Sequence, residues 1–225
     1  KLVPKTKTTA RILYGIYFGL TLILVILLML GGMNLFDSLI HAFGSAGTGG
    51  FSNYADSVGH FDSAYIDYVI SIFMILFGIN FNLYYFMLLG DFKAFWKNEE
   101  LRVYLGIIAT ATILITLNTN QMYGSIMKAF RYALFQVSTI ITTTGYATTD
   151  FNLWPTFSQC IIVLLMIIGA CASSTGGGIK VSRLMIVFKG VKREIKQLVH
   201  PKSVNLIRIN RKKISDETLR GVYVY

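Results

Sequence analysis

Long apolar stretches alternate with short polar ones along the 225 residues of the chain. Apolar runs cover 12–30 and 65–89, and a shorter run covers 103–117. A hydrocarbon core of about 30 Å requires about 20 helical residues, so the first two runs can each cross a membrane. The third can do so if its polar ends lie at the interface. A fourth stretch, 154–188, is long enough but contains a Gly-rich insert at 169–178. The pattern predicts an all-α membrane protein whose chain crosses the bilayer four times.

Two semi-apolar segments between these spans, 35–46 and 124–141, are predicted to be half-helices. A helix of about 11 residues is only about 16 Å long, so it can enter a bilayer but cannot cross it. Each half-helix runs into a stretch rich in Thr and Gly, at 47–52 and 142–147, which we call the first and second Thr/Gly loops. The two regions align without gaps at an offset of 95 residues. The chain therefore contains two copies of one unit: span, half-helix, Thr/Gly loop, span.

The predicted boundaries follow this repeat. They are a cytoplasmic linker at 1–10, a first pore repeat at 11–100 with spans at 11–31 and 64–90, a second pore repeat at 101–190 with spans at 101–118 and 155–190, and a basic cytoplasmic segment at 191–225 whose end reads as the start of a further span.

A Thr/Gly loop after a half-helix suits the binding of a dehydrated cation. Irregular backbone at membrane depth is tolerated where protein or a water-filled cavity surrounds it, and its carbonyl oxygens can replace the water around an ion. Glycine removes the Cβ that would block close approach, and the half-helix turns its partially negative end towards the loop. A re-entrant turn without an ion is the alternative. The candidate ion-binding residues are Thr48, Gly49, Gly50, Thr143, Thr144 and Gly145.

Charge supports a membrane topology. Apolar residues make up 54% of the chain and charged residues only 14%, which is too few for a typical soluble domain. All Lys and Arg except Lys128 and Arg131 lie within 1–11, 93–102 or 180–220, and the positive-inside rule places these three clusters in the cytoplasm. The last cluster includes Lys180, Arg183, Lys192, Arg193 and Lys196.

That basic cluster has a simple alternative explanation, which is attraction to anionic lipid headgroups. Nucleic-acid binding is not expected, because neither aromatic interleaving nor a recognition fold accompanies the charge. The two cysteines, Cys160 and Cys171, lie in apolar runs, so a disulfide scaffold is excluded. No Ser–His–Asp set, HExxH motif or CxxC pair is present, and we expect no enzymatic activity.

Several stretches together resemble the TrkH/KtrB superfamily of potassium uptake channels, and most closely its TrkH side. The resemblance covers the whole chain. It rests on the two Thr/Gly loops and their half-helices and on the stretches Gly59-His60-Phe61-Asp62-Ser63, Trp154-Pro155, Gly169-Ala170-Cys171-Ala172-Ser173-Ser174-Thr175-Gly176-Gly177-Gly178-Ile179-Lys180 and Leu198-Val199-His200-Pro201.

The resemblance implies the second and third of four M1–pore helix–M2 repeats in a potassium channel of the inner membrane. It implies a homodimer, a cytosolic TrkA-like nucleotide-binding regulatory subunit as partner, K⁺ as the transported ion and no organic cofactor. It also implies that the Gly-rich insert is an intramembrane loop that plugs the pore beneath the ion-binding loops. The residues of this gate would be Gly169, Ala170, Ser173, Ser174, Thr175, Gly176, Gly177 and Gly178.

Other interpretations stay open on the sequence. The Gly-rich insert could be a static kink relieved by neighbouring helices. The chain could be a non-conducting membrane scaffold fragment. It could also belong to an ion-coupled secondary transporter, which paired intramembrane acids would favour, and no such pair is evident.

Overall fold

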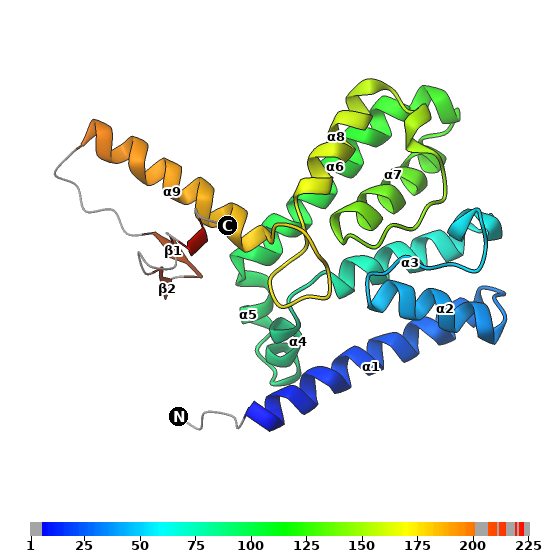
Figure 1. Cartoon of the computed structure of the whole chain (residues 1–225), viewed down its shortest axis with the longest axis horizontal. Coiled ribbons are helices and arrows are strands. Elements are labelled where there is room, and N and C mark those ends of the chain that lie inside the picture. Colours follow the sequence, from blue (N-terminus) through cyan, green and yellow to red (C-terminus); the bar gives the residue numbers. More distant parts are fainter. Residues whose placement is uncertain (1–5, 201–206, 211, 215–218, 220, 223–225) are drawn as a thin grey trace.

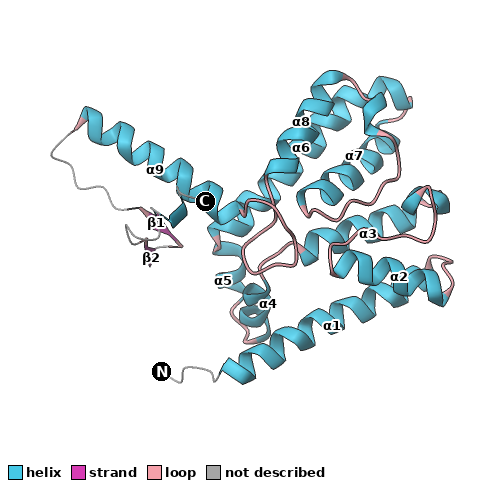
Figure 2. Ribbon diagram, viewed as in Figure 1, coloured by secondary structure: helices cyan, strands magenta, loops and turns pink. Residues whose placement is uncertain are grey.

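The computed structural model describes residues 6–200, 207–210, 212–214, 219 and 221–222, and this part of the chain is predominantly helical (Figures 1 and 2). Residues 1–5 of the predicted linker and most of the predicted further span lie outside the described residues. The elements are α1 (Thr6–Leu30), α2 (Leu35–Ala46), η1 (Ser57–Phe61), α3 (Ala64–Phe77), α4 (Phe81–Leu88), α5 (Phe92–Lys97), α6 (Glu99–Tyr123), α7 (Ile126–Ile141), η2 (Phe151–Leu153), α8 (Thr156–Ile167), α9 (Val181–Val199), β1 (Arg208–Ile209) and β2 (Lys212–Lys213).

Helices α1 and α6 are long and apolar enough to cross a membrane. Each has 25 residues, so each extends about 37 Å at 1.5 Å per residue. Helix α6 is longer than the predicted span 101–118 because both ends are well capped. The side chain of Asn98 accepts a hydrogen bond from the amide of Leu101 (2.9 Å), and Gly124 ends the helix in the left-handed conformation.

The half-helices are α2 and α7. Helix α2 packs between α1 and α3, and α7 packs against α3, α6 and α8 (Figure 1). The side chain of Asn34 caps α2 by accepting from the amide of Asp37 (2.8 Å). The core lies where these helices meet and includes the fully buried side chains of Leu28, Phe77, Tyr104 and Phe135.

The predicted span 64–90 is not one straight helix. Helices α3 and α4 meet at 89°, with the break between Phe77 and Phe81. Asn80 starts α4 by accepting from the amide of Asn82 (3.0 Å), which explains one of the two asparagines in this apolar stretch. The backbone groups freed by the break bond to the Gly-rich loop, as described below.

The predicted span 155–190 is also interrupted. Helix α8 ends at Ile167, and the chain leaves helix until α9 begins at Val181. The Gly-rich loop between them closes on itself, because the amide of Gly169 donates to the carbonyl of Ile179 (2.8 Å). Figure 1 shows this loop turning back across the inner end of α3, while α9 points away from the other helices.

Candidate functional site

The two Thr/Gly loops leave their half-helices in the same way. In the first loop, the amides of Gly49 and Gly50 both donate to the carbonyl of Gly44, at 2.8 and 3.3 Å. The same pair of bonds recurs in the second loop at 2.9 and 3.3 Å, on the carbonyl of Thr139. The repeat seen in the sequence is therefore also a repeat of backbone hydrogen bonds.

Backbone dihedrals repeat as well. Thr48 and Gly50 have positive φ angles of 51° and 65°, and the equivalent Thr143 and Gly145 have 59° and 89°. The residue between each pair is not in the positive-φ region. Threonine rarely adopts positive φ, so its presence there in both copies is a conformation that the surrounding structure enforces.

The two loops touch at the glycine of the first one. A Cβ atom on Gly50 would overlap the carbonyl oxygen of Thr144, so no other residue fits there without displacing backbone. The equivalent Gly145 has nothing within 4 Å of its Cβ position among the described residues. The first loop is therefore covered by the second, whereas the second is open on the corresponding side.

Tyr146 joins the second loop to the first half-helix. Its hydroxyl lies 3.1 Å from the carbonyl of His41 and 3.2 Å from that of Phe51, and its ring stacks on the His41 ring. A Cβ on Gly44 would overlap this hydroxyl, so the glycine makes room for it. His41 itself is buried and hydrogen-bonded to the carbonyl of Asp37 (2.8 Å) and the hydroxyl of Ser52 (3.0 Å).

The Gly-rich loop lies against both Thr/Gly loops through equivalent threonines. The hydroxyl of Thr143 accepts from the amide of Gly177 (2.7 Å). The hydroxyl of Thr48 lies 3.1 Å from the carbonyl of Thr175 and 2.8 Å from that of Gly47, so its one proton is shared between them. The sequence-predicted ion-binding and gate residues are thus brought together in one place.

The Gly-rich loop also fills the break between α3 and α4. A helix end leaves backbone groups without partners, and a buried end must find them elsewhere. Here the loop supplies them through side-chain and backbone bonds. They are Cys171 N–H to Gly78 O (3.0 Å), Phe81 N–H to Ser173 O (3.0 Å) and Thr175 Oγ1 to Phe77 O (3.3 Å).

Further contacts within the loop hold its shape. Ser174 donates its hydroxyl to the carbonyl of Cys171 (2.6 Å), and the ammonium group of Lys180 donates to the carbonyl of Gly176. Ala170 is fully buried, and the backbones of Gly169 and Gly178 cross closely at the neck of the loop. The loop is therefore an ordered element and not a simple kink in a helix.

The remaining basic residues of the predicted cytoplasmic set lie away from the Thr/Gly loops. Arg183, Lys192, Arg193 and Lys196 are all on α9, and the side chains of Lys192 and Lys196 are exposed. Lys189, also on α9, forms an ion pair with Glu99 at the start of α6.

Two charged residues with specific partners were not predicted from the sequence, the partly buried Arg131 and the buried Glu100. Arg131, on α7, pairs with Asp67 at the start of α3 (3.2 Å) and lies 3.6 Å from Asp62. Its position outside the three basic clusters was the available signal. Glu100 is the second, and its carboxylate accepts from the amide of Ala172 in the Gly-rich loop (2.6 Å). Nothing in the sequence distinguished it from an interfacial acid.

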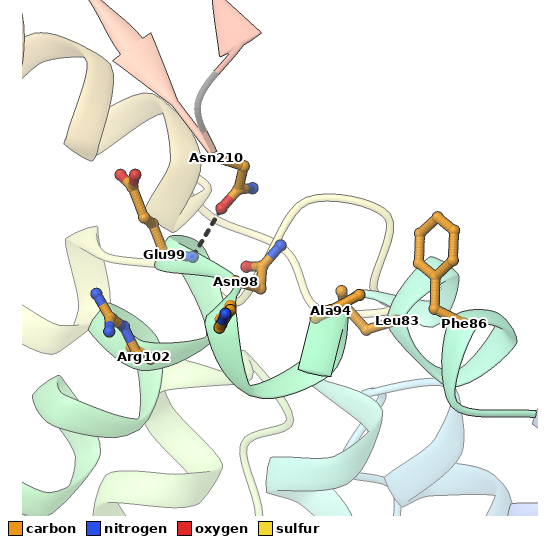
Figure 3. Close-up of a pocket in the computed structure, with 8 residues that line it drawn as sticks. Leu83, Phe86, Ala94, Asn98, Glu99, Arg102 and Asn210 are labelled. Carbon is orange, nitrogen blue, oxygen red and sulfur yellow. Dashed lines mark hydrogen bonds between the residues drawn. The ribbon is translucent and has the colours of Figure 1, made fainter. Parts of the chain in front are cut away.

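A pocket of about 630 Å³ lies apart from the Thr/Gly loops, between α4, α5 and the start of α6 (Figure 3). Its lining combines apolar and charged side chains: Leu83, Phe86, Ala94, Lys97, Asn98, Glu99, Arg102 and Asn210. Within the described ranges, no group of three or more His, Cys, Asp or Glu side chains is placed to hold a metal ion.

Comparison with known proteins gives consistent matches. The family model TrkH, described as a cation transport protein, matches residues 1–224. The Trk system potassium uptake protein TrkH of Escherichia coli K12 is 35% identical over 226 residues, which is 99% of this chain and 47% of the relative. TrkG of the same organism is 32% identical over 232 residues, which is 100% of this chain and 47% of the relative.

A solved structure agrees with these sequence matches. The crystal structure of the potassium transporter TrkH from Vibrio parahaemolyticus superposes with a TM-score of 0.92 at 33% identity, covering 99% of this chain and 49% of that one. The chain thus spans about half the length of the relatives that it matches.

Proposed function

Because the chain belongs to the TrkH family of cation transport proteins, which are not enzymes, we propose that it is part of the pore-forming subunit of a potassium uptake channel. The Thr/Gly loops would be its selectivity filter. Backbone carbonyls of Thr48, Gly49 and Gly50 in one loop, and of Thr143, Thr144 and Gly145 in the other, would take the place of water around K⁺.

The observation that carries this proposal is the repeated backbone of the two loops. In each, φ changes sign from one residue to the next, which lets successive carbonyls face the same side of the strand. The two loops touch at Gly50 and Thr144, so they can line one passage. The C-terminal ends of α2 and α7 point into these loops, and their partial negative charge favours a cation.

Two open positions support further repeats around the same passage. Phe51 is 77% exposed, although its equivalent Tyr146 is buried against the other repeat. Gly145 lacks the neighbouring carbonyl that Gly50 has. A ring of about four such loops would cover both positions, and we propose that this chain supplies the second and third.

The Gly-rich loop would be the gate. It contacts both Thr/Gly loops through Thr48 and Thr143, on the side where an ion leaving the filter would pass. Residues 173–178 of the loop are small and mostly polar, and short side chains of this kind can rearrange at low free-energy cost, which suits a segment that must move.

The surroundings of the pore follow from the charge pattern and the family. We propose that the basic clusters face the cytoplasm across the inner membrane. Two full-length copies would form a homodimer, and helix α9 would face a cytosolic TrkA-like nucleotide-binding subunit. The exposed Lys192 and Lys196 offer this partner, or anionic lipid, a cationic surface.

Ion selectivity tests the filter. In the full-length protein reconstituted into liposomes, Gly50→Ser or Gly145→Ser should lower the preference for Rb⁺ and K⁺ over Na⁺, because serine rarely adopts the positive φ of either position and at Gly50 would also overlap the Thr144 carbonyl. Gly106→Ser is the matched control, since Gly106 lies on α6 with nothing within 4 Å of its Cβ position. Unchanged selectivity in both filter variants would contradict the assignment.

Deletion of the Gly-rich loop tests the gate. Removal of residues 172–177 should raise resting Rb⁺ flux while the preference for K⁺ over Na⁺ is retained, because the filter is left in place. A rise with loss of selectivity would indicate general leakage, and unchanged flux would reject the gate.

A further inference from the structure

Glu100 is a buried carboxylate that bonds directly to the Gly-rich loop. It lies in the first turn of α6, where acidic residues favour the partially positive helix end. Only 5% of the residue is exposed, and Oε1 lies 2.6 Å from the amide nitrogen of Ala172. A hydrogen bond to a carboxylate acceptor is roughly twice as strong as one between neutral groups.

The residue next to Glu100 has a different task. Glu99 pairs with Lys189 on α9. The backbone amide of Glu99 donates to the side chain of Asn210 (2.8 Å), the bond drawn as a dashed line in Figure 3. Two adjacent acids at the start of one helix therefore contact different parts of the molecule. Of these two acids, Glu100 is the one that is hydrogen-bonded to the Gly-rich loop.

Ala172 is the middle of three consecutive anchored residues. Its neighbours Cys171 and Ser173 bond through their backbones to Gly78 and Phe81, on either side of the α3–α4 break. Of the three anchors, Glu100 supplies the only side chain and the only charge. The hydrogen bond between Glu100 and Ala172 is also costly to break, because a buried carboxylate without a partner carries a large desolvation penalty.

We propose that Glu100 is a positioning residue that holds the Gly-rich loop against the Thr/Gly loops, and that loss of its bond to Ala172 releases the loop. We call this Glu100–Ala172 hydrogen bond the latch, and its effect on ion flux rests on the proposed function of the Gly-rich loop as the gate. The placement of the loop, however, can be measured without any ion flux.

Cys171 provides the measurement, because it is fully buried and adjacent to Ala172. In the full-length protein with Cys171 as its only cysteine, the rate of labelling by N-ethylmaleimide, measured as a function of pH and compared at equal thiolate fraction, reports exposure of the loop. Glu100→Ala should raise this rate at least tenfold. Glu100→Gln should raise it by a smaller factor, since the amide oxygen keeps a neutral acceptor of similar shape.

Two controls separate a latch from general loosening. Glu99→Gln removes one negative charge from the same turn without touching the loop, and it should change the Cys171 rate by less than twofold. In a protein whose only cysteine is introduced by Ala133→Cys, a buried position on α7, Glu100→Ala should leave the labelling rate unchanged.

The outcomes distinguish the latch from the gate. Faster Cys171 labelling together with higher resting Rb⁺ flux supports both. Faster labelling with unchanged flux supports the latch and counts against the gate. Labelling of Cys171 within twofold of the parent rate in monodisperse Glu100→Ala and Glu100→Gln proteins overturns the latch, whatever the flux, as does an equal effect of Glu99→Gln.

Discussion

The hydroxyl of Tyr146 lies 3.2 Å from the carbonyl oxygen of Phe51, the residue that occupies the equivalent position in the other repeat. One atom thus distinguishes the two copies, since phenylalanine has no hydroxyl to offer in return. The same hydroxyl reaches the carbonyl of His41 (3.1 Å) and occupies the space above Gly44. The second Thr/Gly loop is therefore positioned by the first half-helix.

Gly44→Ala should destabilise the full-length protein, because the new methyl group overlaps the Tyr146 hydroxyl. Overpacking of this kind typically costs about 1–3 kcal/mol. Adding Tyr146→Phe should restore part of the lost thermal midpoint, since it removes the overlapping atom. Equal midpoints for Gly44→Ala with and without Tyr146→Phe would show that the hydroxyl is not the obstacle.

Gly50 and Gly145 should differ in their tolerance of alanine, although both have positive φ. Gly145→Ala meets only the conformational penalty, about 1–2 kcal/mol. Gly50→Ala meets that penalty and a clash with the backbone of Thr144. If the second loop stays open at Gly145, Gly50→Ala lowers expression and thermal midpoint much more than Gly145→Ala, whereas equal losses in the full-length protein indicate that a further loop covers Gly145. A smaller loss for Gly50→Ala than for Gly145→Ala would contradict the packing of the two loops.

Thr143→Val should loosen the Gly-rich loop more than Thr48→Val does. The first change removes the acceptor of the exposed Gly177 amide, and the net worth of such a hydrogen bond is about 0.5–1.5 kcal/mol. The second removes a donor whose proton is already shared between two carbonyls. Resting Rb⁺ flux should rise further in Thr143→Val, and Thr143→Ser, which keeps the hydroxyl, should behave like the parent.

Arg131→Met should lower stability by about 3 kcal/mol, because it leaves the buried carboxylate of Asp67 without its cation. Adding Asp67→Leu should recover most of that loss, since a buried ion pair can often be replaced by apolar residues of similar size. Thermal denaturation of the two single variants and the double variant forms a complete cycle. A double variant as unstable as the sum of the singles would exclude coupling between these residues.

Much of the architecture could be predicted from the sequence because membrane spans and half-helices carry local signals of length and hydropathy. The helices α2 and α7 and the interruption after Ile167 follow from such signals. The bend between Phe77 and Phe81 did not follow from such signals. An asparagine such as Asn80 in an apolar run is equally compatible with a hydrogen bond between two straight helices. The bend is supported by a loop that lies far along the chain.

Glu100 shows the same limit for the site. Its partner Ala172 is 72 residues away, and no periodicity relates an acid at a helix start to a small residue in a distant loop. Arg131 was visible as an exception to the charge pattern, but its partner Asp67 lies at the start of another helix. Contacts between distant segments carry these roles, and a single sequence does not encode them as a pattern.

The seating of Tyr146 on the earlier repeat gives the assembly a direction. The second Thr/Gly loop is aligned by the half-helix of the earlier repeat as well as by its own, and Phe51 cannot return the contact, so the dependence between these two repeats runs one way. A lesion in the first half-helix should therefore surface as a displaced loop in the second repeat, and exchanging the order of the two repeats would break the alignment even if each kept its own fold.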